Sequence, residues 1–412
     1  MEITSPSQPG IISSRIFRIS KESSLALLFN IFYFIAISDV TSLNIAGGNI
    51  RWSWIALPFL CLLLPKGKEP RIIIIYVLAL FFIHVEASFL YGSFIKGFVY
   101  SAWILVNYLL FFRSAYLITS QLKDGVWNAF LMGGRIQIIS AVILVALGAH
   151  ERAQFIYFEP SYLAIGLVPY LFASIFWSKH KLLDYSLILL ITISNQSATM
   201  MAALFVSILF WLTFNKRFFI SFLLLIFTPL SVYLAYWFSL NNASNPNHSI
   251  AVWISENGIN YDLLLVLLQR GGNRIPRLQA ALDLIDGKWL TGLGTGSYVE
   301  ITSNMNFDYI TDSIKFLDPA GLPVINVILE AIANAGIFAA LILTLVFLTI
   351  FFKGTRIINR QERFIILGSL TAFGIMLQFE SSYLRAYVWF AFGVFAARSR
   401  KSPAVIISGN NL

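Results

Sequence analysis

Charged residues are scarce in this sequence. Only 12% of its 412 residues are Asp, Glu, Lys or Arg, whereas 58% are hydrophobic. Water-soluble domains carry about a quarter charged residues, so too few polar side chains remain here to cover a water-facing surface. The hydrophobic residues also run in long blocks instead of the amphipathic stripes of soluble helices. The composition therefore excludes an ordinary soluble protein and predicts an integral membrane protein.

Cysteine is almost absent as well. Cys61 is the single one, so no disulfide can form within the chain. No group of His, Cys and Asp residues has the spacing of metal ligands. No Asp-rich motif suits a divalent metal holding a nucleotide diphosphate. We therefore expect neither a metal nor a cofactor.

The hydrophobic blocks predict about twelve transmembrane helices, each near or somewhat below the roughly 20 residues that cross a bilayer. The predicted spans are 24–38, 51–64, 72–90, 96–113, 128–148, 161–178, 182–195, 198–214, 218–238, 323–352, 364–380 and 383–397. The expected fold is thus an all-α polytopic membrane protein. It divides into a bundle of about nine helices (1–237), a large polar loop (238–322) and about three further helices (323–412).

Lys and Arg are distributed unevenly between the two sides of this topology. If the N-terminus is cytoplasmic, most of them lie in the N-terminal tail, in the cytoplasmic loops and in the C-terminal tail, as the positive-inside rule requires. Each short outer segment holds a single one: Arg51, Lys96, Arg152 or Arg385. The pattern predicts cytoplasmic termini and an outward-facing loop 238–322. The net charge of +9 is therefore a sign of topology and does not indicate nucleic-acid binding.

Three arginines gather in the outer loop. Arg270, Arg274 and Arg277 lie around a Gly-Gly pair, and a short helix is predicted over 276–286 from Pro276 to the stop at Gly287. Outer arginines can bind anionic lipid head groups. They can equally form a diphosphate site, since guanidinium is planar, permanently charged and bidentate toward phosphate oxygens.

A glycine-rich stretch follows that helix. Gly292, Gly294 and Gly296 alternate in Gly-Leu-Gly-Thr-Gly-Ser. The stretch is neither a P-loop nor a dinucleotide fingerprint, because it lacks a following Gly-Lys-Ser/Thr and a preceding strand. It indicates either tight turns or backbone N–H groups offered to an anion.

Three carboxylates are predicted near the outer face. Glu159 precedes Pro160 at the start of a span, where it is either a helix cap or a general base. Glu380 and Arg385 flank the last outer turn and either pair with each other or line a cavity. Glu330 lies about two turns inside a span, where a charge is costly unless paired or hydrated. Together they predict a cationic pocket with carboxylates that opens outward.

Three patches of the sequence resemble the O-antigen polymerase/O-antigen ligase superfamily. The patches are Tyr157–Ala164 with its Phe-Glu-Pro-Ser, Arg277–Tyr298 with its spaced glycines, and Asn326–Glu330 followed by Gly336-Ile337. The topology with a large loop before the last three spans is similar too. In the ligase branch a histidine precedes the asparagine of the third patch. Ile325 stands at that place here, so the polymerase branch is the better match.

The resemblance implies a bacterial inner-membrane enzyme with its large loop in the periplasm. It implies metal-independent polymerisation of undecaprenyl-diphosphate-linked repeat units into O-antigen, capsular or exopolysaccharide. Its partners would be the lipid-linked donor and acceptor, membrane lipids, a chain-length regulator and a flippase, and no nucleic acid. We assign catalytic roles to Glu159 and Arg277. The expected substrate-binding residues are Arg152, Arg270, Arg274, Arg385, Glu330 and Glu380.

Two alternatives remain at this stage. One is a ligase that transfers finished glycan to a lipid A core. The other is a polysaccharide-related transporter or flippase without chemistry. A transporter of this kind is expected to show matched repeats and ionisable groups near mid-bilayer. The sequence has no internal repeat, and its intramembrane charges favour the outer half.

Overall fold

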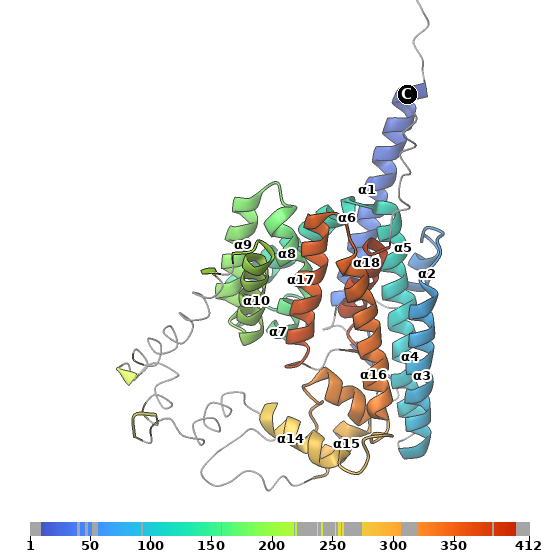
Figure 1. Cartoon of the computed structure of the whole chain (residues 1–412), viewed down its shortest axis with the longest axis vertical. Helices are drawn as coiled ribbons and strands as arrows, with labels where there is room; N and C mark the ends of the chain where they lie inside the picture. The colour runs from blue at the N-terminus through green and yellow to red at the C-terminus, as the bar shows by residue number, and fades with distance from the viewer. Residues whose placement is uncertain are drawn as a thin grey trace, which may run out of the picture.

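The computed structural model describes most of the hydrophobic part of the chain. The described residues are 10–38, 42–45, 48–51, 57–91, 94–157, 159–217, 219–220, 237, 240–241, 252, 254–256, 258, 274–305, 320–380 and 383–400. Within them the regular secondary structure is helical apart from one hairpin (Figure 1). Much of the predicted loop 238–322, including Arg270 and the apolar stretch 261–269, lies outside these residues.

The elements follow one another along the chain as a series of helices. They are α1 (Gly10–Ile37), β1 (Ser42–Ile45), β2 (Gly48–Arg51), α2 (Leu57–Cys61), α3 (Arg71–Tyr91), α4 (Phe94–Val106), the π-helix η2 (Asn107–Phe112), α5 (Arg113–Leu122), α6 (Gly125–Ala146), α7 (Pro160–Gly166), α8 (Val168–Phe176), α9 (Lys181–Asn195), α10 (Ala198–Phe214), α14 (Arg274–Ile285), α15 (Ser297–Ser303), α16 (Val327–Thr355), α17 (Arg360–Met376) and α18 (Ala386–Arg398).

Several of these helices have the length and composition of membrane spans. Among the described residues, four segments are long and apolar enough to cross a membrane: Arg71–Leu90, Gly97–Leu122, Gly125–Ala146 and Val327–Thr355. The helical stretches Thr199–Phe214 and Ala386–Arg398 are apolar but shorter. Large apolar side chains also lie on the outside of the bundle, with Leu62 and Leu182 each 83% exposed. These features are those of a multi-pass membrane protein, in which lipid covers such side chains.

Most predicted spans coincide with helices, but two do not continue as predicted. In 51–64, Arg51 ends β2 and the described helix is only α2, which stops before Pro65. Proline cannot donate a helical hydrogen bond and disfavours helix in the residue before it. The span 161–178 is divided at Leu167 into α7 and α8. Most of 218–238 lies outside the described residues.

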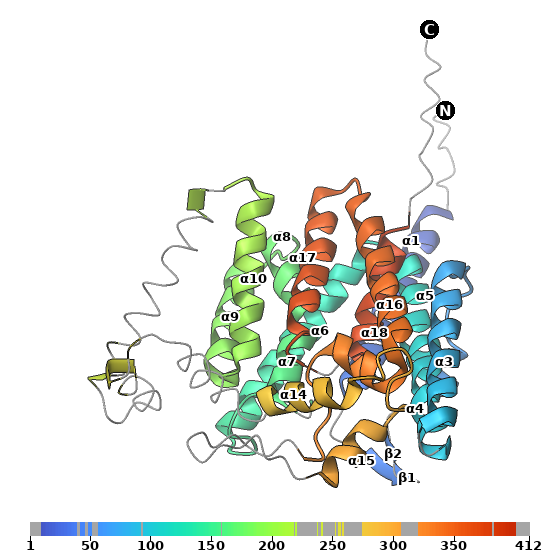
Figure 2. The same cartoon turned by 60° about the horizontal axis from the view of Figure 1, so that its bottom comes forward.

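The hairpin was not predicted from the sequence. β1 pairs antiparallel with β2, with Asn44 opposite Asn49. It lies at the same end of the molecule as α14 and α15 (Figure 2). The short helices and the hairpin therefore gather at one end of the bundle.

The core has two parts. In the main one, the rings of Phe29, Tyr33, Phe130 and Phe390 pack edge-on or stacked at 5.0–5.4 Å, which joins α1, α6 and α18. The second, smaller one holds the described part of the loop 238–322 against α16. Its buried residues are Ala281, Ile285, Leu293, Tyr298, Val324, Ala331, Ile332, Ala333 and Ala340. The loop helices are thus packed on the bundle.

Candidate functional site

Helix α16 is broken where the glycine-rich stretch meets it. Gly336 has φ +79° and ψ 179°, a conformation that essentially only glycine adopts. The break frees backbone groups, and the segment after α14 satisfies them. Leu293 N–H donates to the Ala333 carbonyl at 2.7 Å, and Ile337 N–H donates to the Trp289 carbonyl at 2.8 Å. A loop and a broken membrane helix are thereby joined through their backbones.

The close approach requires glycine on both sides. A Cβ atom at Gly336 would lie 1.9 Å from the Leu290 carbonyl oxygen. A Cβ atom at Gly292 would lie 2.7 Å from the Ile332 carbonyl oxygen. Real Cβ atoms do not approach other atoms so closely. The glycines are therefore needed for contact between backbones.

The rest of the glycine-rich stretch also forms hydrogen bonds with other helices of the chain. Gly296 N–H donates to Asn334 Oδ1 at 3.0 Å, and Thr295 Oγ1 donates to the His84 carbonyl at 3.1 Å. Of the two interpretations made from the sequence, the tight turn describes this arrangement. The N–H groups of Leu293 and Gly296 donate hydrogen bonds to α16, so they are not offered to an anion.

This docking fixes Arg277, which lies in the first turn of α14. Its Nε donates to the Pro323 carbonyl at 2.6 Å, just before α16. Tyr298 at the start of α15 donates its hydroxyl to the Arg277 carbonyl at 3.0 Å. Arg277 is therefore held through both its side chain and its backbone, at the end of the bundle where α14 and α15 lie.

The surroundings of Arg277 are both buried and acidic. Burial lowers the pKa of its guanidinium, whereas Tyr162, Tyr298, Glu380 and Glu159 raise it through their charges. An arginine keeps its proton in proteins in any case. Arg277 is therefore a fixed positive charge within electrostatic reach of two predicted carboxylates from distant parts of the chain.

A second arginine approaches from the start of α18. The Arg385 guanidinium lies over the Tyr162 ring at 4.2 Å from the ring centroid, and its Nη2 donates to the Tyr162 hydroxyl at 2.9 Å. The preceding residue is also held, because Asn107 Nδ2 of η2 donates to the Leu384 carbonyl at 2.8 Å. π-helical turns occur frequently at functional sites. Here the π-helix supports the backbone from which Arg385 projects.

Glu330 lies in the first turn of α16, and one of its carboxylate oxygens accepts no hydrogen bond from the described residues. Its Oε2 is buried and has no hydrogen-bond partner among the described residues. Electrostatic interactions link it to Arg385 and Arg277. The nearby Asn326 acts as a helix cap, accepting from the N–H groups of Ile328 and Leu329. A buried carboxylate oxygen without a partner is costly, so Glu330 is a candidate ligand group.

Of the other two carboxylates, Glu380 follows α17 and Glu159 precedes α7. Glu380 is buried and accepts a hydrogen bond from Thr199 Oγ1 of α10 at 3.4 Å. Glu159 occupies the N-cap position of α7, but its side chain forms no capping hydrogen bond. Instead its Oε2 accepts from the Ser161 hydroxyl at 3.2 Å. The side chain of Glu159 therefore does not serve as a helix cap.

The remaining predicted arginines are placed differently. Arg152 donates Nε to the Asn195 carbonyl at 3.0 Å and Nη2 to the Gln196 carbonyl at 2.7 Å, so it binds the C-terminal end of α9. Arg274 begins α14, but its side chain lies outside the described part, as does all of Arg270. Of the predicted site residues, those brought together are Arg277, Arg385, Glu159, Glu330 and Glu380.

A polar network beside this cluster joins His84 to Tyr383 and Asn334, two residues that sequence reasoning missed. His84 Nδ1 contacts the Leu80 carbonyl at 2.8 Å, so this nitrogen carries the proton. His84 Nε2 then accepts from the Tyr383 hydroxyl at 3.0 Å, and Asn334 Nδ2 donates to the same hydroxyl at 2.9 Å. Asn334 follows Glu330 by one helical turn, a spacing that was visible in the sequence. Tyr383 gave no such signal.

The cluster holds cations and carboxylates but no metal-ligand set. Within the described ranges, no group of three or more His, Cys, Asp and Glu residues could hold a metal ion. A scan against protein-family models and a search of curated proteins both find no match to this chain. Function is therefore inferred from the geometry of these side chains.

Proposed function

We propose that this protein is a glycan polymerase of a bacterial inner membrane. It joins undecaprenyl-diphosphate-linked repeat units into O-antigen, capsular or exopolysaccharide at the periplasmic face. The proposal includes about twelve spans, cytoplasmic termini and a periplasmic loop 238–322. One observation carries it. Glu330 interacts electrostatically both with Arg277 of the outer loop and with Arg385, which precedes α18.

The chemistry requires one bond to form and one to break. A hydroxyl oxygen of the acceptor sugar attacks the anomeric carbon of the donor. The bond from that carbon to the diphosphate oxygen breaks, and its electron pair leaves with the diphosphate. The hydroxyl proton passes to a carboxylate. Negative charge grows on the leaving group, so preorganised guanidinium groups lower the barrier.

The side chains suit these roles. Arg277 donates through Nε to the Pro323 backbone carbonyl, and this hydrogen bond fixes the position of its guanidinium group. Arg385 is oriented by stacking on Tyr162. Glu159 is the proposed base, since its carboxylate is not used in capping the helix that it begins. Glu330 and Glu380 are proposed to bind sugar hydroxyls.

The ligase reaction uses the same leaving group, and only the acceptor differs. A deletion strain distinguishes the two reactions. Loss of a polymerase leaves single lipid-linked repeat units, whereas loss of a ligase leaves long lipid-linked chains. A transporter without chemistry would release no lipid diphosphate.

The test uses purified protein, a lipid-linked repeat unit and an assay for released undecaprenyl diphosphate. We expect the wild-type protein to release it while the glycan lengthens. Arg277→Ala should lower the rate about 10²–10³-fold, as loss of a single electrostatic donor does. Glu159→Gln should lower the rate while leaving substrate binding in place.

Arg356→Ala is the matched control. Arg356 caps the far end of α16 and is exposed there, at the opposite end of the bundle from Arg277. It should retain the wild-type rate. If both Arg277→Ala and Glu159→Gln match the wild-type rate, the assigned roles are wrong. If wild-type protein releases no diphosphate, the polymerase proposal itself is wrong.

A further inference from the structure

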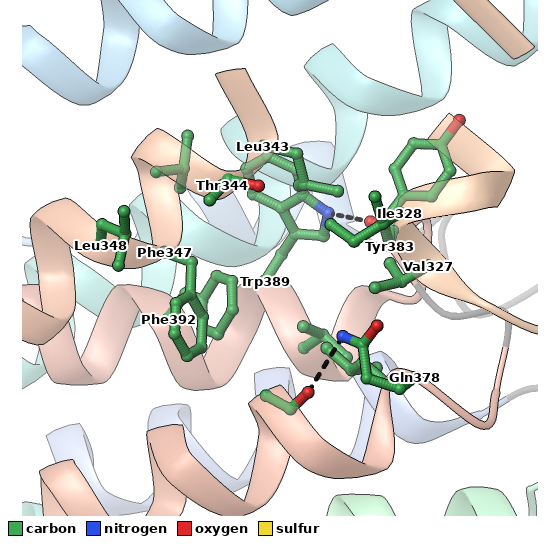
Figure 3. Close-up of a pocket in the computed structure, with 14 residues that line it drawn as sticks. Val327, Ile328, Leu343, Thr344, Phe347, Leu348, Gln378, Tyr383, Trp389 and Phe392 are labelled. Atoms are coloured by element: carbon green, nitrogen blue, oxygen red, sulfur yellow. Dashed lines mark hydrogen bonds between the residues drawn. The ribbon is translucent and has the colours of Figure 1, made fainter. Parts of the chain in front are cut away.

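A cavity of about 260 Å³ lies between α16, α17 and α18 (Figure 3). Its walls are mainly apolar. Leu343, Phe347 and Leu348 come from α16, and Val388, Trp389 and Phe392 come from α18. Ligand cavities in proteins are lined mostly by such side chains, with a few polar groups that orient the ligand. The polar groups of this cavity decide what it can hold.

Those polar groups are already engaged with the protein. Trp389 Nε1 donates to the Tyr383 carbonyl at 2.6 Å, and Gln378 Nε2 donates to the Gly374 carbonyl at 3.0 Å (Figure 3). Thr344 Oγ1 donates to the Ala340 carbonyl at 2.8 Å. The cavity therefore suits a hydrocarbon better than a sugar or a phosphate, each of which needs hydrogen-bond partners.

The surface around the cavity is apolar as well. Leu341 and Leu345 of α16 are 51% and 44% exposed, and Ile375 of α17 is 41% exposed. All three lie on segments predicted to cross the membrane. A lipid chain in the bilayer can therefore reach the cavity without passing through water.

One end of the cavity lies next to the charged cluster. Val327 and Ile328 of its wall precede Glu330 by less than one helical turn, and a turn rises about 5.4 Å. Tyr383, also in the wall, shares a hydrogen bond with Asn334, one turn beyond Glu330. Glu330 in turn interacts with Arg277 and Arg385. An apolar chain and an anionic head group can thus bind side by side.

We propose that this cavity binds the part of a polyprenyl chain that is nearest to its diphosphate, with the diphosphate at Arg277 and Arg385. The inference rests on the proposed function, because it assigns the lipid part of the same substrate. The volume is less than twice the ~150 Å³ of an engineered apolar cavity that holds one benzene, so it holds only a short segment of the chain. The rest of the chain lies in the bilayer.

The test measures binding of undecaprenyl diphosphate to full-length protein in phospholipid nanodiscs. Thr344→Phe and Val388→Phe fill the cavity from opposite walls. Each should weaken binding at least tenfold, because the displaced methylene groups lose their contacts. Leu189→Phe adds the same ring to the exposed face of α9, away from the cavity, and should bind as wild type does. Thermal unfolding shows that each variant is folded.

Arg277→Ala separates this inference from the proposed function. If the cavity-filling variants bind normally while Arg277→Ala binds weakly, the cavity assignment is wrong and the head-group site stands. If the filling variants bind weakly while Arg277→Ala binds normally, the cavity assignment stands and the head-group role is wrong. If every variant binds as wild type does, both are wrong.

Photo-crosslinking from Leu348 identifies the occupant and is independent of any folding defect in the filling variants. A photoreactive residue there should attach to undecaprenyl diphosphate, whereas one at the exposed Leu189 of α9 should attach to bulk phospholipid. A Leu348 cross-link to phospholipid alone, unchanged when undecaprenyl diphosphate is added, would overturn the inference.

Discussion

Arg135 and Asp184 form an ion pair between α6 and α9. Arg135 Nε lies 2.8 Å from Oδ1 and Nη2 lies 2.9 Å from Oδ2, so the pair is bidentate. The Tyr170 hydroxyl also donates to Oδ1 at 2.8 Å. The Asp184 side chain is fully buried and that of Arg135 is 24% exposed. Because each charge is satisfied by protein, the pair has a structural role and is unlike Glu330.

Removing one partner of this pair should destabilise the protein more than removing both. Asp184→Ala leaves a partly buried guanidinium uncompensated, and we expect it to cost about 3 kcal/mol. The double variant Arg135→Met/Asp184→Leu should cost less, because no charge remains to be desolvated. Thermal unfolding in detergent, monitored by circular dichroism, measures both. Equal losses in the single and double variants would contradict the proposed coupling.

At the scale of elements, the break in α16 is the feature on which the site depends. The broken helix and the segment after α14 exchange backbone hydrogen bonds, and that segment directly follows the helix that carries Arg277. Glu330 lies on the part of α16 before the break. The spacing between a loop arginine and a helix carboxylate is therefore set by backbone contact, which is more rigid than side-chain packing.

Gly336→Ala tests this connection. The new Cβ would collide with the Leu290 carbonyl, so the loop must move away or the helix must straighten. We expect a loss of about 3 kcal/mol or more in stability. Limited proteolysis should then cut between α14 and α15. Gly148→Ala is the matched control: Gly148 also has positive φ, +71°, but a Cβ there meets nothing within 4 Å. It should cost only about 1 kcal/mol and leave the loop resistant to protease.

The helices themselves were largely predictable, because a long hydrophobic segment in a membrane can satisfy its own backbone hydrogen bonds only as a helix. The predicted spans 72–90, 128–148 and 198–214 match α3, α6 and α10 within a few residues. The break at Gly336 was not predictable from hydropathy. An Ala-Gly pair is as apolar as its surroundings, and the cause of the break lies in a loop distant in sequence.

The candidate site was predictable only in part, for a related reason. Charges in an apolar sequence are conspicuous, so Arg277, Arg385 and Glu330 could be identified from residue type alone. Their partners could not. Arg152 is as conspicuous as Arg385, yet it binds the end of α9, since backbone carbonyls left over at a helix end attract arginine as carboxylates do. Tyr383 joins the site through hydrogen bonds that no local pattern indicates.

At the scale of the whole molecule, the two ends of the bundle differ in their chemistry. At one end, Arg398 binds Asp124 and Glu362, and Arg400 reaches the Lys68 carbonyl. These residues all come from segments predicted to face the cytoplasm. At the other end lie α14 and α15 (Figures 1 and 2). The segments that the charge pattern assigns to one side of the membrane are thus found together.

Which end faces the cytoplasm decides whether the proposed chemistry has access to exported substrates, and single cysteines can determine it. In a Cys61→Ser background, Ser303→Cys places a thiol at the exposed end of α15, and Thr355→Cys places one at the exposed end of α16. We expect a membrane-impermeant maleimide added to spheroplasts to label the first and not the second. Permeabilised cells should label both, which controls for reactivity. The reverse pattern would put Arg277 and Arg385 in the cytoplasm. Basic residues would then be concentrated on the outer side, against the positive-inside rule, and neither arginine could meet a substrate at the periplasmic face.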